Sequence, residues 1–133
     1  MLRVVLDSNV FISAILFGGK PEKIVNLARC GEIELISSLS IINEVLTVLK
    51  KKFNWNDWQV SQVGIAIREM STIITPISII KTITIDDTDN RVLECAYEGK
   101  ADYIVSGDRH ILSLKQYEGI KILSPAKFLT LRG

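Results

Sequence analysis

The 133-residue sequence predicts a single α/β domain, with helices covering both faces of a mainly parallel sheet. Apolar β-branched segments alternate with segments whose apolar residues recur at helical spacing, a pattern typical of strands joined by right-handed helical crossovers. Hydrophobic residues make up 47% of the chain, which is enough for one core, and no low-complexity stretch or linker divides it. We therefore expect one domain over residues 1–133.

Strands and helices are expected to alternate along the first half of the chain, which ends in a helical hairpin. Pro21 is placed to begin a helix and Gly31 to end it, while Ser37 and Ser38 are the capping candidates for the next one. The predicted elements are a strand over 2–6, helices over 9–16 and 21–30, a strand over 33–36, a helix over 39–52 and, after a link over 53–57, a helix ending near residue 70.

The second half repeats the alternation after a less regular stretch. Residues 73–85 are rich in β-branched residues but are interrupted by Pro76. The elements predicted after it are a helix over 88–98, a strand running to Asp108, a short helix to about residue 115, a strand over 120–123 and a helix beginning at Pro125.

Two apolar segments far apart in the chain each lead to an aspartate. Residues 2–6 precede Asp7, and residues 103–105 precede Asp108 with only Ser106 and Gly107 between. Uninterrupted aliphatic residues favour strands covered on both faces, and in parallel sheets ligands collect beyond the carboxyl ends of the strands. We therefore expect Asp7 and Asp108 to share one edge of the sheet and to form part of an acidic site.

A third acid, Asp89, falls on the same helical face as Val92 and Leu93, the face expected to be buried. A buried carboxylate without compensation is costly, so Asp89 needs a cation, a metal or backbone N–H partners. Helix capping is the alternative for Asp89, and capping or a solvated turn is the favoured interpretation of Asp86 and Asp87.

The fourth acid is Glu44, in the helix predicted over 39–52. It borders the apolar stripe formed by Ile42, Val45 and Leu49, from which it can point across the edge of the core toward a cleft. Taken alone, Glu44 would be interpreted as an exposed residue of a good helix former. The other three acids make it a candidate site residue.

In order along the chain, four segments resemble the motifs of PIN domains, particularly those of the VapC-like toxins of prokaryotic toxin–antitoxin systems. They are DSNVFISA at 7–14, EVL at 44–46, DDTDNRVLECA at 86–96 and ADYIVSGD at 101–108. The resemblance implies a Rossmann-like three-layer fold and metal-dependent cleavage of RNA. It implies a catalytic cluster binding Mg²⁺ or Mn²⁺, made of Asp7, Glu44, Asp89 and Asp108, with supporting roles for Ser8, Asn9, Asn90 and Ser106.

The resemblance also implies partners. In toxin relatives an antitoxin tail enters the acidic cleft, and the domains form homodimers through the early helices, which correspond here to residues 9–24. Packing of these residues in the core of a single domain is equally compatible with the sequence.

A divalent cation explains why four acids would be kept together. Carboxylates packed closely raise one another's pKa values, and a cation removes that repulsion. Mg²⁺ prefers oxygen ligands and retains several waters, so a few carboxylates suffice, whether one or two ions bind. His110 stands where many relatives carry another aspartate, and we interpret it as a residue at the edge of the cleft or at the start of a helix rather than as a ligand.

Composition bounds the remaining choices. Sixteen basic and fifteen acidic residues nearly balance, so any nucleic-acid binding needs a local patch, for which Lys20, Arg91, Arg109 and the lysines at 50–52 are candidates. No signal peptide or membrane-spanning run is expected, and the chain is predicted to be cytoplasmic. The two cysteines, Cys30 and Cys95, are predicted to be buried thiols, and Trp55 and Trp58 to fill core or interface rather than to stack on bases.

Two other functions remain as alternatives. A catalytically inactive scaffold of the same fold would have no need for four mutually repelling acids. A receiver-like phospho-acceptor also places aspartate at strand ends and binds Mg²⁺, but it would leave Glu44 and Asp89 without a role.

Overall fold

The computed structural model describes residues 1–77 and 87–132, and the elements alternate largely as the sequence predicts. The elements of the first half are β1 (Arg3–Leu6), α1 (Ser8–Leu16), α2 (Gly19–Arg29), β2 (Glu34–Ser38), α3 (Leu39–Phe53), α4 (Asp57–Met70) and β3 (Ser71–Ile74). Those of the second half are α5 (Asp87–Glu98), β4 (Tyr103–Val105), α6 (Arg109–Leu112), β5 (Gln116–Tyr117), β6 (Ile120–Leu123) and α7 (Pro125–Arg132).

The described strands form one sheet in the order β3-β2-β1-β4-β6-β5. Every neighbouring pair is parallel except β5 with β6, which is antiparallel. The prediction of a mainly parallel α/β sheet is therefore confirmed. The sequence did not predict β5, whose two residues are too few to show any periodicity.

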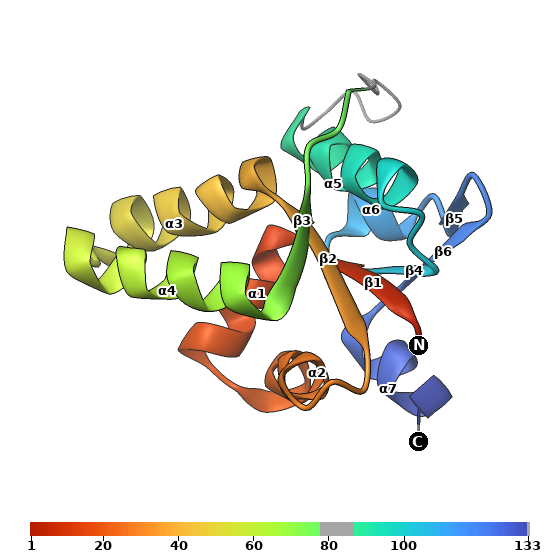
Figure 1. Ribbon diagram of the computed structural model, residues 1–133, viewed down its shortest axis with the longest axis horizontal. Coiled ribbons are helices and arrows are strands. Elements are labelled where there is room, and N and C mark those ends of the chain that lie inside the picture. The colour runs from red at the N-terminus through yellow and green to blue at the C-terminus, as the bar shows by residue number, and fades with distance from the viewer. Residues whose placement is uncertain (78–86, 133) are drawn as a thin grey trace.

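Helices cover the sheet on both sides (Figure 1), with α5 and α6 above it and α2 and α7 below in that view. Helix α5 packs against β1, β2 and β4, whereas α1 packs against α2 and α3. The hairpin of α3 and α4 extends to the left of the strands (Figure 1), with α4 against both α3 and β3. This is the three-layer arrangement expected of a Rossmann-like fold.

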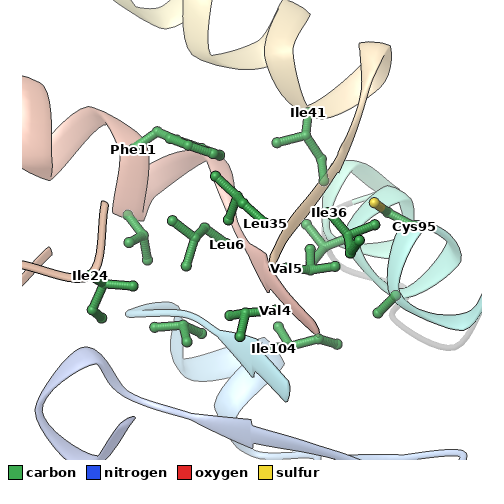
Figure 2. Packing of buried hydrophobic residues seen from close by; sticks show 14 of the residues in the cluster. Val4, Val5, Leu6, Phe11, Ile24, Leu35, Ile36, Ile41, Cys95 and Ile104 are labelled. Carbon is green, nitrogen blue, oxygen red and sulfur yellow. The ribbon is translucent and has the colours of Figure 1, made fainter. Parts of the chain in front are cut away.

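The core fills both faces of the central strands. Figure 2 shows Leu6 of β1 on the side of Phe11 and Ile24, whereas its neighbour Val5 lies toward Cys95 of α5. Val5, Leu6 and Ile24 have no solvent exposure. Successive residues of a strand point to opposite faces, so the uninterrupted apolar run of β1 is what a strand covered on both sides requires.

Capping and glycine residues determine where several helices begin and end. Ser38 caps α3, since its hydroxyl accepts a hydrogen bond of 3.3 Å from the backbone N–H of Ile41. Gly31 follows the end of α2 with a φ of 75°, a conformation that favours glycine. At Gly99, after α5, an added Cβ would lie 2.6 Å from the side chain of Ile36. Glycine at this position lets the chain after α5 pass close to Ile36 of β2.

The expectation that both cysteines are buried is wrong for Cys30, and of the two tryptophans only Trp55 lies at the core of this chain. Cys30 is exposed, because it follows the last residue of α2 and lies past the buried face of that helix. Cys95 is buried, and burial raises the pKa of its thiol to about 12. Trp58 is 71% exposed, because it lies on the side of α4 opposite to the buried Ile67, whereas Trp55 does pack against the core.

Two sequence-based expectations lie outside the described residues. These are the structure of most of 73–85, where β3 accounts for only the first part, and the capping roles of Asp86 and of the side chain of Asp87. Among the helices described, none has the length and apolar character needed to cross a membrane.

Candidate active site

The structure brings Asp7 and Asp108 to the same edge of the sheet. Strands β1 and β4 are parallel neighbours, with Leu6 paired to Val105, and the backbone N–H of Asp7 donates to the carbonyl of Val105 at 3.1 Å. Asp7 directly follows this pair and caps α1, whereas Asp108 follows it after Ser106 and Gly107 and caps α6. The expectation that the two strand ends meet is therefore fulfilled by the sheet register.

Ser106 bridges the two acidic positions. Its hydroxyl donates a hydrogen bond to Oδ2 of Asp7 and accepts one of 2.9 Å from the backbone N–H of Asp108. The side chain of Ser106 has no solvent exposure, and the serine is held in place by the extension of β4. One buried hydroxyl thus fixes the Asp7 carboxylate relative to the backbone that carries Asp108.

Asp7 is a buried carboxylate in a strained electrostatic position. Only 3% of the residue is exposed, and burial raises its pKa from 3.8 to about 6. The hydrogen bonds from Ser106 and from the backbone N–H of Val10, the latter at 2.9 Å, counteract this rise, whereas the charges of Asp108 and Glu44 add to it. The ionised form of Asp7 therefore lacks a compensating positive charge, which is the situation in which a bound cation is most favourable.

Glu44 reaches this site from α3. It lies in the second turn of that helix, half-buried beside the core residues Ile41 and Val45. Its charge is one of the two that raise the pKa of Asp7, so the carboxylates are within electrostatic reach of each other. The position at the border of the apolar stripe is the one that the helical spacing predicted.

Asp89 is placed by its helix. It lies in the first turn of α5, is 8% exposed, and belongs to a helix that packs against β1, β2 and α3. Because α5 forms part of the crossover from β3 to β4, its first turn faces the same edge of the sheet as the ends of those strands. The acidic charges that raise the pKa of Asp7 include those of Asp108 and Glu44.

The four predicted supporting residues have different surroundings. Ser106 is the bridge already described, and Ser8 and Asn90 are buried in the first turns of α1 and α5. Asn9 is exposed, and in the part of the chain that the structure describes its amide makes no hydrogen bond with a carboxylate. Ser8, Asn90 and Ser106 thus lie within the protein, while Asn9 faces outward beside the site.

Two basic residues near the site, Arg91 and His110, have different surroundings. Arg91 forms a 3.0 Å ion pair with Glu94, three residues on in α5. Glu94 is 5% exposed, a burial that sequence reasoning did not predict, although the spacing of three between opposite charges on one helix could have indicated the pair. His110 is exposed in the first turn of α6, and its backbone N–H donates to Oδ1 of Asp108 at 2.7 Å, as expected for a helix-start residue.

The residues at this edge fit a hard divalent cation in their chemistry. All of the candidate ligands are carboxylates, and burial raises the pKa of the most buried of them, Asp7. Within the described ranges, no three His, Cys, Asp or Glu side chains lie close enough together to hold a metal ion between them. An open set of oxygen ligands suits Mg²⁺, which retains several waters and is bound through one or two carboxylates.

Comparison with known proteins agrees with this architecture. The family model described as "PIN domain" matches residues 3–110. A protein of Methanocaldococcus jannaschii, named Uncharacterized protein MJ1680, is 34% identical over 119 residues, which cover 86% of this chain and 76% of that protein. The crystal structure of PAE2754 from Pyrobaculum aerophilum superposes with a TM-score of 0.61 at 11% identity, covering 98% of this chain and 96% of the other.

A mainly parallel sheet with acids at its carboxyl edge is an arrangement that PIN domains share. The match to the family model extends over most of the chain, including β1, α3, α5 and Asp108. The chain belongs to the PIN domain family. Proteins of this family are generally nucleases, and they typically use Mg²⁺ or Mn²⁺.

Proposed function

We propose that this protein is a metal-dependent endoribonuclease that hydrolyses RNA phosphodiester bonds. The observation that carries the proposal is the junction of β1 and β4, where buried Ser106 ties the uncompensated Asp7 carboxylate to the backbone of Asp108. A structural role alone does not account for Asp7, because an asparagine could cap α1 equally well without a buried charge.

Each acid has a distinct task in this proposal. Asp7 and Asp108, with Asp89, would hold the metal, and Glu44 would bind it directly or through a water. Bound Mg²⁺ or Mn²⁺ supplies a nucleophilic water near neutral pH and neutralises charge on the phosphate. The protein fixes the orientation of Asp7 through Ser106 and Val10, and that of Asp108 through the backbone N–H of His110. Orienting charges before the substrate arrives is how such a site lowers the barrier.

We further propose that the enzyme is the toxin of a toxin–antitoxin pair, acts in the cytoplasm and forms a homodimer. The VapC-like motifs support the toxin assignment, and the free Cys30 and Cys95 suit a reducing compartment. Phe17, at the end of α1, is 78% exposed, which supports an interface formed by the early helices. An antitoxin would inhibit by occupying the acidic edge.

The test is cleavage of a mixed-sequence, end-labelled RNA by purified protein with Mg²⁺, Mn²⁺ or EDTA. Wild-type protein is expected to cut only with metal, and Asp7→Asn and Asp89→Asn are expected to abolish cutting. Asp57→Asn is a matched control, because Asp57 is exposed at the start of α4 and pairs with Lys50. Activity unchanged in both site variants would refute the site, and a folded protein inactive with every metal would favour the inactive scaffold.

A receiver-like phospho-acceptor remains the other alternative. It would be labelled at an aspartate by a small phosphoryl donor in the presence of Mg²⁺. Incorporation of phosphate that is lost in Asp108→Asn, without RNA cleavage, would replace the nuclease proposal.

A further inference from the structure

A small cavity lies beside the bridge formed by Asp7, Ser106 and Asp108. Asn9, two residues after Asp7, forms part of its wall, and so does Gly107, which joins Ser106 to Asp108. The cavity therefore includes the residue directly before Asp108 and a residue in the first turn of α1, the helix that Asp7 caps. Its volume is about 190 Å³, and its lining residues are Asn9, Val10, Ser13, Pro21, Gly107 and Pro125.

The lining combines apolar surfaces with two groups that can form specific hydrogen bonds. Val10, Pro21 and Pro125 present rigid hydrocarbon surfaces, while Asn9 contributes an amide and Ser13 a hydroxyl. An asparagine amide can donate and accept at once, as the edge of a nucleobase requires. Mostly apolar walls with a few placed polar groups are typical of small-ligand pockets.

Two features keep the cavity accessible. Asn9 is exposed, and its amide has no hydrogen-bond partner among the residues that the structure describes, so the amide is free to bind a ligand. At Gly107, an added Cβ would meet no atom within 4 Å, so the wall is open on that side. Both the amide of Asn9 and the backbone at Gly107 are therefore accessible to a ligand in the cavity.

Positive charge lies just beyond the cavity. A second hollow, between α2 and α7, is lined by Lys20, Lys23 and Thr130, together with Ala126 and Leu129. It starts at the residues next to Pro21 and Pro125, which line the cavity itself. Neither Lys20 nor Lys23 forms an ion pair with any described residue. Acids, an uncharged pocket and lysines thus follow one another along this side of the molecule.

We infer that this cavity binds one unpaired base of an RNA strand next to the scissile phosphate. Asn9 and Ser13 read the edge of the base, the two prolines pack against its faces, and Lys20 and Lys23 contact a neighbouring phosphate. Only unstacked, single-stranded nucleotides expose their base edges in this way. The inference rests on the proposed function and makes Asn9 and Ser13 determinants of base preference.

Binding tests the inference without requiring cleavage. Fluorescence polarisation of labelled four-nucleotide RNAs, one for each base, is measured with wild-type protein in EDTA. One RNA is expected to bind at least about 10-fold more tightly than the others, the discrimination that one asparagine–base contact supplies. Asn9→Ala is expected to remove this preference, and Ser13→Ala to reduce it. Asn26→Ala, an exposed asparagine of α2, is the matched control and should keep it.

The lysines are tested in the same assay. The double variant Lys20→Gln/Lys23→Gln should weaken all four RNAs equally and lower the salt dependence by about 0.7 per lost phosphate contact. Equal binding of the four RNAs by wild-type protein, or a preference that survives in both Asn9→Ala and Ser13→Ala, would overturn the inference. A preference that depends on Asn9 in a protein that cuts no RNA would instead refute the proposed nuclease and leave the base site standing.

Discussion

Replacing Asp7 by asparagine should stabilise the metal-free protein while destroying its activity. Burial raises the pKa of Asp7 from 3.8 to about 6, so at pH 7.5 the folded state carries an ionised carboxylate that it disfavours. At about 1.4 kcal/mol per pKa unit, this difference corresponds to ~3 kcal/mol of lost stability. Asparagine has no charge, and it can still cap α1 by accepting from the backbone N–H of Val10.

The sign of the pH dependence follows from the same values. Because the folded state binds the proton of Asp7 more tightly than the unfolded state does, the destabilisation is fully present above pH 6 and absent below about pH 3.8. The stability gained by Asp7→Asn should therefore be greatest at pH 7 to 8. It should shrink as the pH falls through 6 toward 4.

Thermal and urea unfolding in EDTA at several pH values measure this effect. At pH 7.5, Asp7→Asn is expected to raise the melting temperature by roughly 10 °C, given a few degrees per kcal/mol for a chain of this size. The exposed Asp57, whose pKa is lowered by its hydrogen bond with Lys50, is the control, and Asp57→Asn should bring no gain. A destabilised Asp7→Asn, or a gain that is constant from pH 8 to pH 4, would refute the electrostatic reasoning.

Three further outcomes are expected. Mn²⁺ should raise the melting temperature of wild-type protein at pH 7.5, and the rise should shrink below pH 6 because protons compete with the metal for Asp7. Asp7→Asn should show no rise, and calorimetry of metal binding checks both results. Ser106→Ala should lower the single-turnover cleavage rate about 10- to 100-fold, whereas Ser106→Thr should retain most of the rate, because the hydroxyl orients Asp7. Equal cleavage rates for the two variants would exclude this positioning role. Gly99→Ala should cost about 1 to 3 kcal/mol in urea unfolding, since its Cβ would lie 2.6 Å from Ile36, and an unchanged midpoint would contradict this.

The edge that carries the candidate site could be predicted because it follows from topology. Parallel strands joined by crossovers bring their carboxyl ends together, so Asp7 and Asp108 had to approach each other once β1 and β4 became neighbours. The hydrogen bond from Ser106 to Asp7 could not be predicted in the same way. It depends on the register that pairs Leu6 with Val105, which local sequence patterns do not encode.

Other differences have equally local causes. The position of Trp58 depends on which side of α4 meets α3, where Leu46 packs against Gly64, and not on the hydrophobicity of the tryptophan. Cys30 follows an amphipathic helix but lies beyond its last turn, where helical periodicity no longer applies. The cavity beside Gly107 is assembled from α1, α2, α7 and the loop before α6, so no single segment of sequence predicts it.

The central claim is that the acids joined through Ser106 form a metal site that cleaves RNA. The most direct measurement is single-turnover cleavage of end-labelled RNA as a function of Mn²⁺ concentration, for wild-type protein and for Asp108→Asn. Wild-type protein should show a saturable rise in rate, and Asp108→Asn should show little cleavage together with weaker metal dependence. Cleavage that is insensitive to EDTA, or that is equal in the two proteins, would contradict the account.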